Sequence, residues 1–101
     1  MKTIKVKISV TAEDIEHGEK QNCRFCPIAL ASFRSFRESL IGHDYFYCEI
    51  HEIILVNIRG RRAFVSENLT EDVLNFIDDF DSGKEVSPFE FEAVFEERPM
   101  Q

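Results

Sequence analysis

Both ends of the chain alternate between apolar and polar residues, strictly at the N-terminal end and with one exception at the other, and this pattern constrains the fold more than any other feature. Residues 3–10 carry isoleucine or valine at every second position, with lysine or serine between them. Residues 89–96 carry phenylalanine or alanine in the same way, with glutamate at most of the intervening positions. Because strand side chains point alternately to opposite faces, each end predicts a half-buried strand. Facing lysines and glutamates attract by about 0.2–1 kcal/mol per pair, so we expect the two strands to be antiparallel neighbours.

A short helix is predicted directly after the first strand, over residues 11–18. Thr11 and Asp14 have the spacing of a capping box, in which each side chain bonds the other residue's backbone N–H. Gly18 is expected to end this helix in the left-handed conformation.

Two longer helices form the main helical part of the prediction. The first begins at Cys26 or Pro27, because proline is well tolerated in the first helical turn, and it closes at Gly42. The second runs from Thr70 to Gly83. Apolar residues at helical spacing predict the buried positions, with Ser32 on another face. These positions are Ala29, Phe33, Phe36 and Leu40 in the first helix, and Val73, Phe76 or Ile77, and Phe80 in the second.

The middle of the chain predicts further strands. Residues 45–50 and 53–58 are rich in aromatic and branched residues and form either one bent strand or two. Gly60 is expected at the tip of a tight turn that leads into residues 62–66. The order of elements predicts one α+β domain over residues 1–101, with an antiparallel sheet and two main helices on one face. The ferredoxin-like βαββαβ order is the leading arrangement.

The net charge of −7 is concentrated in the last third of the chain. Residues 1–66 have a net charge of +2, whereas residues 67–101 have a net charge of −9. An acidic surface argues against general nucleic-acid binding, which needs basic residues for phosphate contacts. No apolar run approaches the roughly 20 residues of a membrane-spanning helix, and the N-terminus lacks a signal-peptide core. We therefore expect a cytoplasmic protein without membrane contact.

The spacing of Cys23 and Cys26 allows three interpretations. Both sulfurs could reach one zinc ion, which needs two further ligands. Alternatively, Cys23 could be a redox thiol exposed at a helix N-terminus. In the third interpretation Cys26 only packs beneath the helix. An odd number of cysteines argues against a disulfide framework. The candidate metal ligands are Cys23, Cys26, Cys48 and His51, with His43 and His17 as further possibilities.

Two charged sets are candidate binding surfaces. Guanidinium groups suit phosphate or carboxylate, so an arginine set could hold an anion or a partner, although a solvated turn with local ion pairs is the favoured explanation. An acidic strip on the last strand could face a basic partner or pair with Lys5 and Lys7. The first set is Arg34, Arg37, Arg59, Arg61 and Arg62, and the second is Glu90, Glu92 and Glu96.

Two segments of the chain resemble small uncharacterised proteins encoded by bacteriophages and prophages. They are C-x-x-C-P-I-A-L-A over residues 23–31 and F-I-D-D-F-D-x-G-x-x-V-x-P-F-x-F over residues 76–91. The resemblance implies a phage origin and a location in the host bacterial cytoplasm. Many small acidic phage proteins act by binding, including some that block host defence systems.

Binding without catalysis is the function that these observations favour. No catalytic triad spacing and no phosphate-binding glycine loop occur in the sequence. We expect an acidic phage-type accessory protein that binds a host protein or a small ligand through a charged face, without a cofactor. The alternatives are a zinc-stabilised domain built on Cys23 and Cys26, a thiol-redox protein, and an anion- or nucleotide-binding module. The sequence does not predict an oligomeric state.

Overall fold

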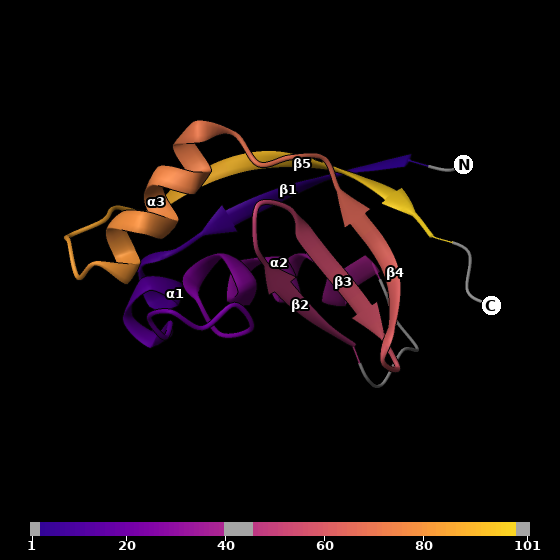
Figure 1. Ribbon diagram of the computed structural model, residues 1–101, viewed down its shortest axis with the longest axis horizontal. Helices are drawn as coiled ribbons and strands as arrows, with labels where there is room; N and C mark the ends of the chain where they lie inside the picture. The colour runs from indigo at the N-terminus through magenta and orange to yellow at the C-terminus, as the bar shows by residue number, and fades with distance from the viewer. Residues whose placement is uncertain (1–2, 40–45, 99–101) are drawn as a thin grey trace.

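The computed structural model of the protein describes residues 3–39 and 46–98 and has the predicted α+β architecture (Figure 1). Its strands are β1 (Thr3–Val10), β2 (Phe46–Ile50), β3 (Ile54–Ile58), β4 (Arg61–Ser66) and β5 (Phe89–Glu97). Its helices are α1 (Ala12–His17), α2 (Pro27–Ser39) and α3 (Glu71–Asp81). The strands form one antiparallel sheet in the order β1-β5-β4-β3-β2. Figure 1 shows α1 and α3 toward one end of this sheet and the β3–β4 turn toward the other.

The predicted pairing of the first and last strands is confirmed. β1 and β5 are antiparallel along their whole common length, with Lys7 opposite Glu92 and Ser9 opposite Glu90. Lys7 Nζ lies 3.1 Å from Glu90 Oε2, diagonally across the pair. Both side chains are exposed, so this ion pair contributes at most about 1 kcal/mol.

The ferredoxin-like order is not confirmed. The segment left open by the sequence forms two strands, β2 and β3, which pair as a tight hairpin. The sheet therefore has five strands, with β1 and β2 at its two edges. α2 packs against both of these edge strands, so the sheet curves around this helix. Strand order depends on such long-range packing, which local periodicity does not encode.

The buried face of α2 differs from the predicted one. Phe36 is fully buried and meets Phe95 edge-on, with 4.7 Å between ring centroids. Phe33, expected beside it, is 38% exposed and stacks on Phe46 instead. Ser32 is fully buried in its place, and among the described residues its hydroxyl finds no hydrogen-bond partner. Ala29 and Phe36 are buried as predicted, but the buried face is centred on residues 28, 32 and 36, about one position away from Phe33.

The remaining helix predictions are largely confirmed. α3 buries Val73, Phe76 and Phe80, which join the same core cluster as the buried residues of α2. Thr11 and Asp14 form the capping box of α1. Leu40 and Gly42, expected near the end of α2, lie outside the described residues.

The glycines behave in two ways. Gly60 and Gly83 have φ values of 77° and 82°, so both adopt the left-handed conformation that glycine favours. Gly18 does not, because its φ is −66°. A Cβ at Gly18 would lie 2.6 Å from Pro27 Cδ, so close approach explains this glycine and the expected left-handed cap is wrong. Gly18 thus allows the end of α1 to touch the start of α2.

The helices of the described segments are short for membrane insertion. None of them combines the length and the apolar character needed to cross a bilayer.

Candidate functional site

A groove of about 330 Å³ runs between α2 and the edge strand β2, and we call it the β2 groove. Three consecutive residues of β2 line it, and since their side chains alternate in direction, the groove must follow the edge of the strand. The opposite wall comes from α2 and from the loop that precedes it. The lining residues are Arg24, Phe25, Ala29, Leu30, Phe33, Phe46, Tyr47 and Cys48.

The β2 groove holds both of the large hydrophobic side chains that are exposed within the described residues. Phe25 is 51% exposed and Phe33 is 38% exposed. The Phe33 ring stacks on Phe46 at 4.6 Å, and the Arg24 guanidinium lies 4.3 Å from the centroid of the Tyr47 ring. Scattered surface hydrophobics are common, but adjoining aromatic rings beside a groove are typical of a binding surface.

The backbone of β2 faces this groove along an edge with which no other strand of the described residues pairs. In an antiparallel pair, successive residues direct their backbone groups alternately toward the partner strand and away from it. The Ile50 N–H points away from β3, because it donates to the Cys23 carbonyl at 2.8 Å. Cys48, two residues earlier, points its backbone groups in the same direction. Within residues 3–39 and 46–98, no backbone carbonyl accepts its N–H on that side.

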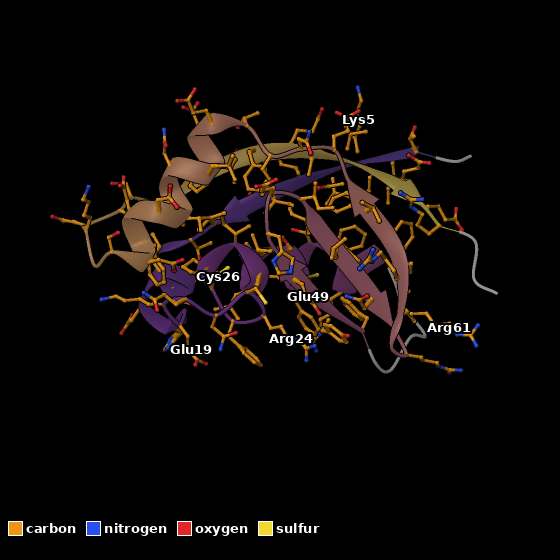
Figure 2. The ribbon with its side chains drawn as sticks, viewed as in Figure 1. Lys5, Glu19, Arg24, Cys26, Glu49 and Arg61 are labelled. Carbon is orange, nitrogen blue, oxygen red and sulfur yellow. The ribbon has the colours of Figure 1, made fainter. Side chains whose placement is uncertain are left out.

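A cluster of three possible metal ligands lies at the end of β2. The ligand atoms of Cys23, Glu49 and His51 all lie within 4.8 Å of one another. Glu49 Oε1 accepts a hydrogen bond from Arg24 Nη2 at 3.2 Å (Figure 2). Glu49 Oε2 lies 3.3 Å from His51 Nε2. Glu49 and His51 are two residues apart along an extended chain, which places both side chains on one face.

The other two cysteines lie in the core and are not among the three clustered ligands. Cys26 and Cys48 are 6% and 2% exposed, and all three cysteines are free thiols. Burial raises the pKa of the Cys26 thiol, even though its sulfur accepts a hydrogen bond from Ala29 N–H at 3.4 Å. Burial also raises the pKa of the Cys48 thiol, to about 12. Both thiols are therefore harder to ionise than an ordinary cysteine, and the burial of both side chains limits their access to a metal ion or a redox substrate.

The structure divides the four expected metal ligands into two pairs. It brings Cys23 and His51 together and adds Glu49, whereas Cys26 and Cys48 pack in the interior. Of the remaining histidines, His17 lies in the last turn of α1, and His43 lies outside the described residues.

The candidate arginine set is also divided. Arg34 donates two hydrogen bonds of 2.8 Å to the buried Asp14 carboxylate and a third to the Ser9 carbonyl. Burial alone would raise the pKa of Asp14, but the hydrogen bonds and the charge of Arg34, together with the Thr11 N–H, outweigh it and lower that pKa. The Arg34 guanidinium is therefore occupied by contacts within the fold and is a poor candidate for binding an external anion. The other arginines of the set lie elsewhere: Arg37 is exposed on α2, Arg59 is in the β3–β4 turn, and Arg61 and Arg62 are on β4.

The acidic strip of β5 lies beside lysines of the neighbouring strand β1. Glu90 and Glu92 are exposed, and Glu96 is partly buried. Lys7 pairs with Glu90, and Ser9 Oγ donates to the same carboxylate at 3.4 Å. This surface is consequently less acidic than the sequence of β5 alone predicts.

Sequence reasoning missed Glu49, Arg24 and the exposed aromatic residues. The spacing of Glu49 and His51 was a usable signal, because residues i and i+2 of a strand share a face. Nothing local to the sequence indicates that the loop at Cys23 approaches that face, or that Phe33 turns outward. Arg24 and Phe25 are the two variable positions of the C-x-x-C motif, which by itself predicts a role for the cysteines only.

No protein-family model, curated protein or solved structure matches this chain. The resemblance to phage-encoded proteins consequently remains a prediction. The function of the protein is best inferred from the β2 groove and from the cluster of Cys23, Glu49 and His51 beside that groove.

Proposed function

We propose that the protein is a binding module that takes up an extended segment of a partner protein along the β2 groove. The observation that carries this proposal is the coincidence of a free strand edge with exposed aromatic rings. An added strand would hydrogen-bond to the outward backbone groups of β2, and its apolar side chains would enter the groove. In this proposal the protein acts by binding and not by catalysis.

The Cys23 carbonyl supports a strand-like occupant. It already occupies the position of an added strand at Ile50, where it accepts the N–H that points away from β3. An extended segment would continue this pairing at Cys48, the next residue with outward backbone groups. The edge therefore suits a peptide backbone more than a compact small molecule.

The free energy available from the two exposed phenylalanine rings indicates how tightly such a segment would bind. The exposed fractions of Phe25 and Phe33 together equal nearly one phenylalanine side chain. Covering them contributes about 1.5–3 kcal/mol, far short of the roughly 8 kcal/mol of micromolar binding. Main-chain hydrogen bonds and the partner's own apolar side chains must supply the rest, so we expect moderate affinity and recognition of large apolar residues at positions i and i+2.

The resemblance to phage proteins extends the proposal to the partner's source. If the chain is phage-encoded, its partner is a protein of the host bacterial cytoplasm. Interference with host defence is then one role that such binding could serve. This part of the proposal depends on the resemblance alone and stands apart from the chemistry of the β2 groove.

A random-peptide selection on the immobilised protein tests the binding chemistry directly. We expect enriched peptides to share two large apolar residues spaced by two. The double variant Phe25→Ser/Phe33→Ser should weaken the best peptide by about 10-fold or more, since 1.4 kcal/mol corresponds to a tenfold change. Lys5→Ser, an exposed change on the opposite edge strand, is the matched control and should bind as the unmodified protein does.

Backbone methylation of the peptide separates strand addition from simple apolar contact. N-methyl groups at alternate residues should abolish binding in one phase of the alternation and leave it nearly intact in the other. Equal binding by the double phenylalanine variant, or indifference to methylation in both phases, would count against the proposal.

A further inference from the structure

The loop before α2 and the end of β2 hold three side chains of different chemistry in one place. Cys23 supplies sulfur, His51 supplies an imidazole nitrogen and Glu49 supplies a carboxylate oxygen, all within 4.8 Å of one another. Cys23 and Glu49 are partly buried, whereas His51 is exposed. Two of the three ligands are therefore anchored in the protein surface, and the cluster is open to solvent on the side of His51.

We propose that Cys23, Glu49 and His51 bind a zinc ion, with water in the fourth position. Thiolate and imidazole ligands favour zinc over calcium or magnesium, which prefer oxygen ligands. Three protein ligands with one open position is a recurring zinc arrangement. The proposed site replaces Cys26 and Cys48 of the sequence prediction with Glu49.

The separations fit a tetrahedral ion. With metal bonds of about 2.0–2.1 Å to nitrogen and oxygen and about 2.3 Å to sulfur, neighbouring ligand atoms lie about 3.3–3.6 Å apart. Glu49 Oε2 and His51 Nε2 are already 3.3 Å apart. The Cys23 sulfur lies within 4.8 Å of a ring nitrogen of His51 and of a carboxylate oxygen of Glu49, so a shift on the order of 1 Å would bring it to a tetrahedral distance.

Backbone contacts hold the three ligands in place before any metal binds. The Cys23 carbonyl accepts the N–H of Ile50, the residue between the other two ligands, at 2.8 Å. The His51 N–H in turn donates to the Ile53 carbonyl at 2.9 Å, which fixes the turn after β2. These bonds tie the cysteine loop to the strand end that carries the carboxylate and the imidazole.

Arg24 orients the carboxylate. Its guanidinium binds Glu49 Oε1 at 3.2 Å, which leaves Oε2 directed toward the imidazole and free to bind the metal through one oxygen. Hydrogen bonds of this kind to a ligating carboxylate are a common feature of metal sites. Arg24 also lines the β2 groove, so the metal would fix one wall of that groove together with the loop that carries Phe25.

Titration of the full chain with Zn²⁺ and Co²⁺ in a non-chelating reductant tests the site. We expect one metal per chain, a rise in Tm with Zn²⁺, and the thiolate-to-metal charge-transfer band of tetrahedral Co²⁺. Binding should release the Cys23 thiol proton to the buffer, because only the thiolate ligates.

Variants identify the ligands. Cys23→Ser should remove the charge-transfer band, and Cys23→Ser and His51→Gln should each weaken Zn²⁺ binding by more than about 100-fold, the upper end for outer-shell changes. Glu49→Gln should weaken it by at least about 10-fold. His17→Gln, a histidine change on α1, is the matched control and should bind Zn²⁺ normally.

Two results would overturn the proposal. One is a folded, reduced protein that binds neither metal at stoichiometric concentrations. The other is unchanged binding after Cys23→Ser, which would place the metal elsewhere. Circular dichroism of each variant shows whether a loss of binding reflects loss of a ligand or loss of the fold. Since these titrations contain no peptide, their outcome is independent of the proposed partner binding.

Discussion

The two edges of the sheet are protected to very different degrees, although α2 contacts both of them. Along β1, Arg34 caps the Ser9 carbonyl at 2.8 Å, and Ser35 Oγ shares its proton between the Ala31 carbonyl at 2.9 Å and the Lys7 carbonyl at 3.3 Å. Along β2, the helix presents Phe33 and leaves a groove. Exposed strand edges promote aggregation, and proteins usually protect them. The contrast between one protected edge and one open, aromatic edge is the feature on which the proposed strand addition rests.

Two phenylalanines on α2 give the largest expected contrast between these regions. Phe36→Ala should lower the free energy of unfolding by about 3–5 kcal/mol, because the ring is fully buried against Phe95. Phe33→Ala should cost less than about 1.5 kcal/mol, since that ring is already partly in water. Urea denaturation measures both. Equal losses would mean that the groove side of α2 is packed as tightly as the core.

Opening the protected edge is the second test. Arg34→Ala leaves the Asp14 carboxylate, only 5% exposed, without its partner. A fully buried pair broken in this way costs about 3–5 kcal/mol, and because Arg34 is half exposed we expect about 2–3 kcal/mol. Arg37→Ala, on the same helix, is the control and should stay within about 0.5 kcal/mol. A midpoint for Arg34→Ala that matches the control would show that β1 does not depend on this cap.

Acid should weaken the same edge by a smaller amount. The pKa of Asp14 lies below its ordinary value of 3.8 in the folded protein, because hydrogen bonds from Arg34 and Thr11 outweigh the effect of burial. The stabilisation is therefore complete above the unfolded pKa and is lost as pH falls through the folded one. Thermal unfolding between neutral pH and strong acid should show this loss, and Asp14→Asn should remove that part of the pH dependence. An unchanged profile in Asp14→Asn would assign the acid sensitivity to other carboxylates.

Hydrogen exchange gives the smallest effect and reports on the open edge alone. The Cys48 amide points away from β3 and should therefore exchange faster than its neighbours. The amides of Tyr47 and Glu49 point toward β3 and are protected by the strand pairing. A bound peptide should slow Cys48 selectively. Slow exchange at Cys48 in the free protein would mean that the edge of β2 is already covered.

The sequence allowed the strand elements and one long-range contact to be predicted. Alternation and complementary charge identified β1 and β5 as partners because both signals are local and the charges face one another. The strand order was not predictable in the same way, since it depends on how α2 lies across both edges. The exposure of Phe33 follows from a small rotation of that helix, which the spacing of apolar residues does not define.

The candidate site was predictable only in part for a similar reason. Cys23 and His51 were selected as residue types with metal chemistry, and the structure brings them together. Cys26 and Cys48 were selected on the same ground, but the core that surrounds them keeps their thiols neutral. Burial decides between a ligand and a packing residue, and burial is a property of the whole fold.

The unequal burial of the three cysteines also has a practical consequence. A maleimide or iodoacetamide reagent needs an accessible thiolate, and Cys26 and Cys48 are both buried and protonated. Native protein should therefore be modified first at Cys23, without any engineered cysteine. A fluorophore attached there would sit one residue from Arg24, at the rim of the β2 groove, and could report on whatever occupies it.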